Sequence, residues 1–472
     1  MRIPRTAPLF SWEHLDDQPD LKTLRRLLDE FPDRHLMAAL KNHRGHGRND
    51  YPIAVLWRTH LASIFLRHPF TESTLAELRR NEGLCRVIGI DSPQQVPTPP
   101  AMSRFLAVLG RPEFRALMRA MFDTLVRQLG QAVPDLGQHT AGDSTHLQSK
   151  NELSDADAAE IDSTNPPPLA PQGLPQPAYG VKEYKDDQGK ISKVVKWFGF
   201  KLHLLVDVTH EIPLAFEITG ANAPDNQHIA PLLEQAEQNL PASRIETLAY
   251  DKAADDVKVH ELCRRHRIKP LIQLRKNPHG PKEELVPNRQ GLRQFVYNDQ
   301  GDVLCYDTLS EPPIQRPMAF HGYDSANDTL KYRCPAKAFG FTCKSLEKCN
   351  GASEFGKTIR ISPQLDPRRF PEIPRATKTF ERLYKGRTAV ERVFAREKVL
   401  FKIDDTKLSG SGRYIARVET VLLAQLALGR LLASVPRDEP SASTLGRARL
   451  SPIAQRLEAA IREQSAAPTA AS

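Results

Sequence analysis

Cysteines and long hydrophobic runs are scarce in this sequence. Six cysteines among 472 residues are too few for the disulfide framework of a small secreted protein. The first residues lack the apolar core of a signal peptide, and no stretch reaches the roughly 18 uninterrupted apolar residues of a membrane span. The most apolar run, Val418 to Leu428, is short and contains Glu419 and Gln425, which indicates a buried helix. We therefore expect a cytoplasmic protein with reduced thiols.

The composition is that of a folded protein with a basic surplus. Hydrophobic residues make up 40% and charged residues 26% of the chain, which is enough apolar material for a sizeable core. At roughly 150 residues per domain, the length predicts about three structural units. Lys and Arg outnumber Asp and Glu by nine, and the isoelectric point is near 9.2. This surplus favours a polyanionic partner, with nucleic acid as the first candidate.

The hydrophobic pattern divides the chain into a helical first part and an α/β second part. Residues 20–131 repeat apolar positions at intervals of three and four, as amphipathic helices do. From residue 137, strand patterns alternate with helix patterns, and the strands at 196–208 and 212–220 are expected to form an antiparallel hairpin. We predict a helical region over 1–132, an α/β domain over 133–435 with an exposed loop at 149–190 and a β-rich insertion at 278–375, and a disordered tail over 436–472.

Two aspartates stand at predicted strand positions that suit an active site. Asp143 lies inside or at the end of the first strand, and Asp251 ends a later strand immediately before a helix. Active sites of α/β sheets gather at carboxyl ends of strands, and a divalent metal would offset the cost of burying two carboxylates there. Each residue also has an ordinary structural interpretation, with Asp143 bonding its own backbone in a turn and Asp251 capping the next helix.

A third acidic residue, Glu391, lies in a more informative pattern. Tyr384, Arg387, Glu391 and Lys398 are separated by 3, 4 and 7 residues, so they can share one helical face. Gly386 weakens that helix, which leaves Tyr384 either on the face or in a turn just before it. A carboxylate beside two cations and a phenol suits a metal-bound phosphodiester. The alternative is structural, because Arg387 can pair with Glu391 across one turn and Thr388 has capping-box spacing to Glu391.

The surrounding segment holds most of the basic surplus. Residues 357–402 contain thirteen Lys and Arg against five Asp and Glu. Cations around an acidic centre are what DNA binding beside a metal site requires, since phosphates need cations and metals need carboxylates. A solvated basic helix is the alternative.

Two further groups of polar residues are open to more than one interpretation. Cys334, Cys343 and Cys349, together with Cys305 or His321, can form a zinc site, but their spacing lacks a close cysteine pair and favours free core cysteines. Along one predicted strand Lys201, His203 and Asp207 alternate, and Asn222 and Asp225 follow its partner. These residues can face the site, although ordinary polar residues of a sheet surface are the favoured interpretation.

The sequence resembles the DDE transposases of bacterial insertion sequences, in the group with Tyr, two residues, Arg, three residues, Glu, six residues, Lys. YKGRTAVERVFAREK matches this signature at every defined position. AGDSTHL and LAYDKAADD look like the two Asp motifs of the family, and FGFKLHLLVDV and IPLAFEITGANAPDNQH look like its second and third strands. The resemblance covers most of residues 51–432, whereas 149–190 and the tail match nothing recognisable.

The resemblance implies a ribonuclease-H-like mixed sheet with Asp143, Asp251 and Glu391 as catalytic residues and metal ligands. It further implies two Mg²⁺ ions, for which Mn²⁺ can substitute, and DNA phosphate contacts from Tyr384, Arg387 and Lys398. The helical region would bind DNA or dimerise, and the enzyme would act as a homodimer on transposon ends and target DNA, in the bacterial cytoplasm near the nucleoid. Two other functions stay open: a DNA-binding protein derived from a transposase, and a metal-dependent nuclease without strand transfer.

Overall fold

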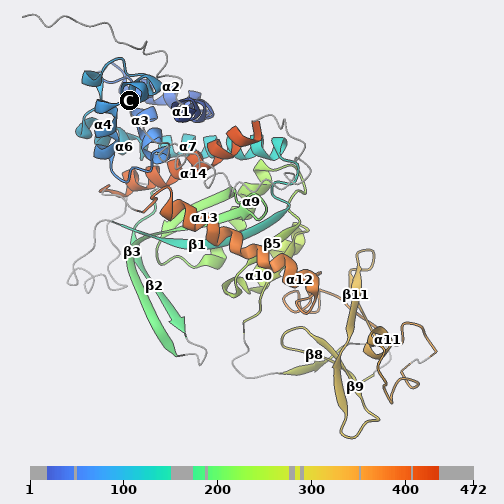
Figure 1. The fold of residues 1–472 in the computed structure, drawn as a ribbon. Coiled ribbons are helices and arrows are strands. Elements are labelled where there is room, and N and C mark those ends of the chain that lie inside the picture. Colours follow the sequence, from blue (N-terminus) through green and yellow to red (C-terminus); the bar gives the residue numbers. More distant parts are fainter. Residues whose placement is uncertain are drawn as a thin grey trace, which may run out of the picture.

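The computed structural model describes residues 19–46, 50–149, 174–185, 190–275, 282–287, 292–349, 352–404 and 408–434. Within these residues, helices occupy the N-terminal part, a mixed sheet follows, and a smaller β-rich part extends to one side (Figure 1). The predicted tail at 436–472 and residues 150–173 of the predicted loop lie outside the described residues.

The N-terminal part is helical, as the apolar spacing predicts. Its helices are α1 (Pro19–Asp29), α2 (Arg34–Arg44), α3 (Ile53–Phe65), α4 (Thr71–Arg80), α5 (Glu82–Ile88), the 3-10 turn η2 (Pro93–Gln95), α6 (Pro99–Leu109) and α7 (Pro112–Ala132). The prolines of α6 and α7 stand in the first turn, where a missing N–H breaks no helical hydrogen bond. Among the described residues, no helix is both long and apolar enough to cross a membrane.

The central sheet has six strands and mixed pairing. They are β1 (His139–Gln148), β2 (Ala178–Lys185), β3 (Ile191–Asp207), β4 (Pro213–Gly220), β5 (Thr247–Tyr250) and β6 (Lys269–Ile272). The order is β2-β3-β1-β5-β6, and β4 also pairs with β3. β3 runs antiparallel to β1, β2 and β4, whereas β1, β5 and β6 are parallel. The connections carry η3 (Asp225–His228), α9 (Ile229–Asn239), η4 (Lys252–Ala254) and α10 (Val257–Arg265).

The predicted hairpin is confirmed, but the predicted loop is wrong in its last part. β3 and β4 pair antiparallel, as the sequence predicts. Residues 178–185, expected to be exposed loop, form β2 and pair with the first half of β3, which begins at Ile191. The many prolines just before this segment hide its strand pattern. At Gly180 an added Cβ would lie 2.3 Å from the Trp197 ring, so the missing side chain leaves room for this indole.

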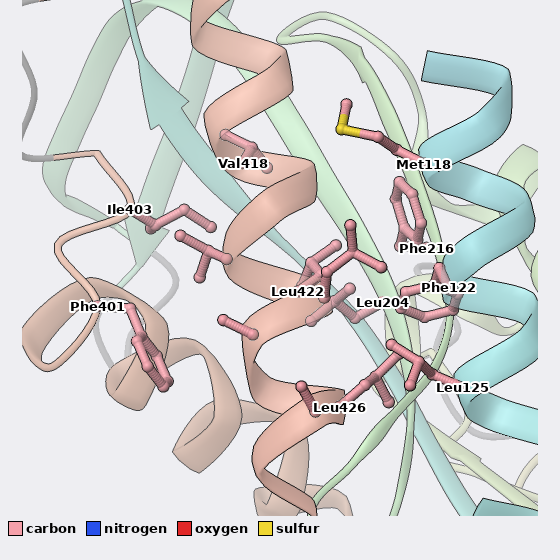
Figure 2. Close-up of a cluster of buried hydrophobic side chains, with 14 of the residues drawn as sticks. Met118, Phe122, Leu125, Leu204, Phe216, Phe401, Ile403, Val418, Leu422 and Leu426 are labelled. Atoms are coloured by element: carbon pink, nitrogen blue, oxygen red, sulfur yellow. The ribbon is translucent and has the colours of Figure 1, made fainter. Parts of the chain in front are cut away.

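Helix α14 (Ser411–Ser434) joins the helical part to the sheet. Figure 2 shows Leu422 and Leu426 of this helix on the side that faces Leu204 of the sheet and Leu125 of α7. These side chains belong to one continuous buried cluster that spans the N-terminal helices and the sheet. Helix α14 also passes close to the end of α6, where a Cβ on Gly110 would lie 2.3 Å from the Gly412 backbone. The apolar run at 418–428 is therefore a buried helix, as predicted.

The β-rich part has its own small core. Its first sheet contains β7 (Glu283–Leu285), β8 (Phe295–Asn298), β9 (Val303–Asp307) and β10 (Ile314–Pro317), and its second contains β11 (Ala319–Asp324), β12 (Thr329–Arg333) and β13 (Thr358–Ile361). The short helix α11 (Pro335–Phe339) follows β12. A hydrophobic cluster separate from the main core, including Phe295, Leu330 and Phe370, holds the two sheets together. Arg368 attaches this part to the main body through Asp255, at 2.7 and 2.8 Å.

Candidate active site

The parallel pairing of β1 and β5 brings two aspartates to the same level of the sheet. Ala141 stands opposite Ala249; Asp143 follows two residues later within β1, and Asp251 follows two residues later, just past the end of β5. β5 ends at Tyr250, so Asp251 begins the next turn, where its carboxylate accepts a hydrogen bond from the Ala253 N–H at 2.8 Å. Asp251 therefore caps the short 3-10 turn η4, and α10 is capped instead by Asp256.

Asp143 has an environment that disfavours its charged form. Its side chain is 29% exposed, and its carboxylate accepts a hydrogen bond from the Ser144 N–H at 2.7 Å. Burial, together with the nearby Asp251 carboxylate, raises the pKa of Asp143 to about 6, against the lowering effect of the backbone hydrogen bond. Two like charges at one edge of the sheet are unfavourable unless a cation lies between them.

Glu391 reaches this edge from a helix that is broken at Gly386. The predicted long helix is divided into α12 (Lys378–Tyr384), the 3-10 turn η5 (Lys385–Arg387) and α13 (Thr388–Val399). Glu391 lies in the first turn of α13 and is 51% exposed. A Cβ at Gly386 would meet the Val208 side chain at 2.6 Å, so glycine lets the turn approach the end of β3 closely.

Arg387 links the carboxylates. Its guanidinium donates to Glu391 Oε1 at 2.7 Å and lies 3.7 Å from Asp143 Oδ2. The pairing that the sequence offers as a structural alternative is therefore present, and the same arginine also reaches the first aspartate. Tyr384 lies at the end of α12, stacked on Phe380 with ring centroids 5.4 Å apart. The pKa of the Tyr384 phenol is raised, chiefly by burial. Asp251 adds to this effect and Arg387 opposes it.

Lys398 lies away from the carboxylates. Seven residues separate it from Glu391, roughly 10 Å along a helix that rises 1.5 Å per residue. Its ammonium donates to the His146 carbonyl oxygen at 2.8 Å and pairs with Asp404 at 3.3 Å. It therefore fastens α13 to β1, three residues beyond Asp143.

A tyrosine fills the space beneath the two aspartates. Tyr250 is 5% exposed, and a Cβ on Gly142 would lie 2.1 Å from its ring. Burial raises the pKa of this phenol well above its ordinary value, and the charges of Asp143 and Asp225 add to the effect. The glycine directly before Asp143 therefore leaves room for this ring to pack against β1.

A polar network lies next to Asp143. The sequence pattern favoured an interpretation of its residues as ordinary polar residues of a sheet surface. Asp225 accepts hydrogen bonds from the Ser144 hydroxyl at 2.9 Å and from the Lys201 ammonium at 3.2 Å. His203 Nδ1 is 3.7 Å from the same carboxylate. His203 and Asp207 are 2% and 0% exposed, so the surface interpretation is wrong for both. Strand alternation placed Lys201 and His203 on one face but carried no information on burial.

Asp207 does not belong to this network. Its carboxylate accepts from the Gly137 N–H at 2.7 Å and from the His210 N–H, which shapes the turn after β3. In that turn Glu211, 2% exposed on its side chain, accepts from Arg392 at 2.6 Å and from Arg396 at 2.5 Å. Both arginines belong to α13, which also carries Glu391. Glu211 therefore holds this helix against the sheet.

The comparison with protein families agrees with this arrangement. A family model described as transposase DDE domain matches residues 138–426, which is more than half of the chain. The chain belongs to this transposase family. A search of curated proteins returned no significant match. The matched range begins just before β1 and ends within α14, so it contains both aspartates, Glu391 and the β-rich part.

In the site of this transposase, Asp143 and Asp251 are more available to a cation than Glu391. The Asp251 carboxylate disfavours the charged form of Asp143, and the Arg387 guanidinium donates a hydrogen bond to Glu391 Oε1 at 2.7 Å. Among the residues that the structure describes, no group of three or more His, Cys, Asp or Glu side chains is arranged to hold a metal ion. The oxygen ligands suit Mg²⁺, and Glu391 can join them once Arg387 turns from it to another anion.

Most cations of the basic segment at 357–402 are paired within the fold. These pairs are Arg360 with Asp324, Arg368 with Asp255, Arg369 with Glu284, Lys385 with Glu381, Arg392 and Arg396 with Glu211, and Lys398 with Asp404. These pairs therefore compete with any phosphate for the same cations. Lys378 and Arg382 are exposed on α12, close in sequence to Tyr384.

Proposed function

We propose that this transposase binds the ends of its insertion sequence and catalyses metal-dependent DNA cleavage and strand transfer. The observation that carries the proposal is the common level of Asp143 and Asp251 on neighbouring parallel strands, with Glu391 and Arg387 above Asp143. Family membership supports the same chemistry.

The catalytic domain is proposed to be ribonuclease-H-like, over residues 133–435. In support, the strands run β4-β3-β1-β5-β6, with antiparallel pairs on one side of β1 and parallel pairs on the other. The helical region at 1–132 is proposed to bind DNA or to form the dimer of the synaptic complex. Residues 278–375 are proposed to be an insertion, which the separate hydrophobic core supports.

In this proposal each site residue has its own task. Asp143 and Asp251 would hold the cations, and Glu391 would join them as a ligand when DNA is present. Two bound Mg²⁺ ions would activate the attacking hydroxyl and stabilise the leaving oxygen of the phosphodiester. Arg387 moves its hydrogen bonds from Glu391 to a phosphate oxygen, because the guanidinium binds either anion through the same N–H groups. The Tyr384 hydroxyl and Lys398 contribute further phosphate contacts.

The test is cleavage of a linear duplex that carries the flanking end of the element, with Mg²⁺ or with EDTA. Wild type should cut at the end only with Mg²⁺. Glu391→Gln should lose on the order of 10³-fold in cleavage rate, as expected for an essential group of a catalytic unit, while it still binds the end. Cleavage by Glu391→Gln at the wild-type rate would remove this residue from the site.

Added target DNA separates the remaining functions. Joined products between the element end and the target support strand transfer. Cleavage without joining indicates a metal-dependent nuclease, and binding without cleavage in every metal indicates a DNA-binding protein derived from a transposase.

A further inference from the structure

Four of the six cysteines gather in the β-rich part. Cys305, Cys334, Cys343 and Cys349 all line one cavity of about 20 Å³. A volume of this size holds a single particle the size of a water molecule. Cys85 and Cys263, by contrast, belong to the main core. The sequence favours four unrelated core cysteines, whereas the structure brings them around one small space.

The four thiols come from three segments that are held together near the cavity. Cys305 belongs to β9, and Cys334 stands between β12 and α11. After α11, Cys343 comes just before a turn and Cys349 lies at its end. Asp307, two residues after Cys305, accepts hydrogen bonds from the backbone N–H groups of Lys344 and Ser345 at 2.9 and 3.0 Å. This carboxylate therefore fastens the segment that carries Cys343 to the strand that carries Cys305.

A polar group points at one of these sulfurs, because the Gln294 amide donates to Cys349 Sγ at 3.1 Å. Hydrogen-bond partners outside a metal site orient the residues that ligate the metal, and Gln294 is in a position to do this for Cys349.

Hydrophobic packing does not account for the group. The apolar cluster of the β-rich part contains no cysteine among its buried members, and Cys305 only borders it from a half-buried position. That cluster has ten buried residues, a small core for two sheets. Small units with little core are often stabilised by a structural metal, whose binding free energy adds to folding.

We propose that Cys305, Cys334, Cys343 and Cys349 bind one structural zinc ion. Four thiolates are the ligand set of closed tetrahedral zinc sites. No three side chains among the described residues are preset as ligands. Zinc would therefore draw the 343–349 turns inward onto Cys305 and Cys334. The site is independent of the proposed catalytic carboxylates.

The test measures zinc in the full-length protein, purified without chelator and after dialysis against Mg²⁺. Elemental analysis should find one zinc per chain. Glu391→Gln should keep this zinc, because the carboxylates are not its ligands. Wild-type protein that contains no zinc after growth and refolding with added Zn²⁺ would overturn the proposal, and so would one iron–sulfur cluster per chain.

Matched cysteine variants locate the ion. Cys305→Ser and Cys349→Ser should lose the zinc, whereas Cys85→Ser and Cys263→Ser should retain it. Zinc retained in all four variants would place the ion elsewhere and refute the assignment. Because ligand variants can fail to fold, wild type is also loaded with Co²⁺ in place of Zn²⁺. Its visible spectrum should be that of a tetrahedral four-thiolate site, and an octahedral oxygen-ligand spectrum would contradict the proposal.

Discussion

Asp143 is the residue whose chemistry depends most on its surroundings. Without a cation, burial and the neighbouring Asp251 raise the pKa of Asp143 to about 6. A metal binds the ionised carboxylate, so binding displaces a proton below that pH. We expect cleavage to increase as pH rises through about 6, and the midpoint to move to lower pH as the Mg²⁺ concentration increases. A pH profile of end cleavage at two Mg²⁺ concentrations measures this.

A midpoint that does not respond to Mg²⁺ would mean that Asp143 is not a metal ligand. The control is the pH dependence of DNA binding, measured in the same buffers with EDTA. Binding depends on phosphate contacts, so its midpoint should not shift with the cleavage midpoint.

Individual site residues could be predicted where they belong to a spaced pattern. Arg387 and Glu391 were found because four side chains share helical spacing, and the structure places both beside Asp143. Asp225 was considered but interpreted as a surface residue, and Tyr250 was not found, because the proximity of both to Asp143 depends on segments far apart in the sequence. The Gly142 contact with the Tyr250 ring is of the same kind, and no local pattern signals it.

At the scale of elements, the position of α13 depends on one buried carboxylate. Glu211 accepts from Arg392 and from Arg396, whose side chain is only 9% exposed. Removing this carboxylate leaves a buried guanidinium without its partner. Glu211→Ala should lower the free energy of unfolding by about 3 kcal/mol, measured by urea denaturation.

The matched control is Glu381→Ala, which breaks the exposed pair of α12 with Lys385 and should leave the unfolding midpoint unchanged. Equal effects of the two substitutions would show that Glu211 does not anchor the helix.

Helix α13 also carries a carboxyl group that should be neutral. Glu397 is fully buried, and burial raises its pKa to about 8, against the lowering effect of Arg396. The unfolded chain ionises this group near its ordinary pKa of 4.5, so stability is lost as pH rises from about 4.5 to about 8. Glu397→Gln removes this loss. Its Tm should exceed that of wild type at pH 8 by several degrees more than at pH 5, by thermal unfolding.

A constant difference between the two proteins at both pH values would show that Glu397 does not titrate with a raised pKa in the folded state. Glu381→Gln on the exposed face of α12 serves as the control, with no pH-dependent difference expected.

Most elements follow from periodicity, and the exceptions have physical reasons. The N-terminal helices, the β3–β4 hairpin and the α9 and α10 helices are confirmed because each has an amphipathic or alternating pattern of sufficient length. The strand β2 was missed because its neighbours are proline-rich, and the start of β3 was placed five residues late because polar residues precede Trp197. The sequence indicates that Gly386 weakens the helix, and the structure shows the 3-10 turn η5 at this position, with Tyr384 at the end of α12.

At the scale of the whole molecule, net charge does not identify the DNA-binding surface. Because most cations of residues 357–402 are paired internally, we expect the exposed Lys378 and Arg382 of α12 to contact phosphates. Replacing both with Ala should weaken binding to element ends. The slope of log K against log salt concentration should become shallower by about 0.9 for each phosphate that no longer pairs with a cation of the protein.

Binding titrations across a series of salt concentrations measure the slope. Arg360→Ala is the matched control, since its guanidinium pairs with Asp324 at 2.8 Å in the β-rich part. A slope equal to that of wild type in the double variant would remove α12 from the interface.

The central claim is that Asp143, Asp251 and Glu391 hold the same metal centre. The most direct test replaces Asp143 or Asp251 with Cys and measures end cleavage in Mg²⁺ and in Mn²⁺. A thiolate is a softer ligand, which Mg²⁺ accepts poorly and Mn²⁺ accepts better. Asp225→Cys, which changes a neighbour of the site, is the control and should show no difference in its metal preference. The account predicts that both catalytic variants are inactive in Mg²⁺ and recover part of their cleavage in Mn²⁺. Equal activity of the Asp143 and Asp251 variants in Mg²⁺ and in Mn²⁺ would contradict it. So would inactivity of these variants in both metals while Asp225→Cys prefers Mn²⁺.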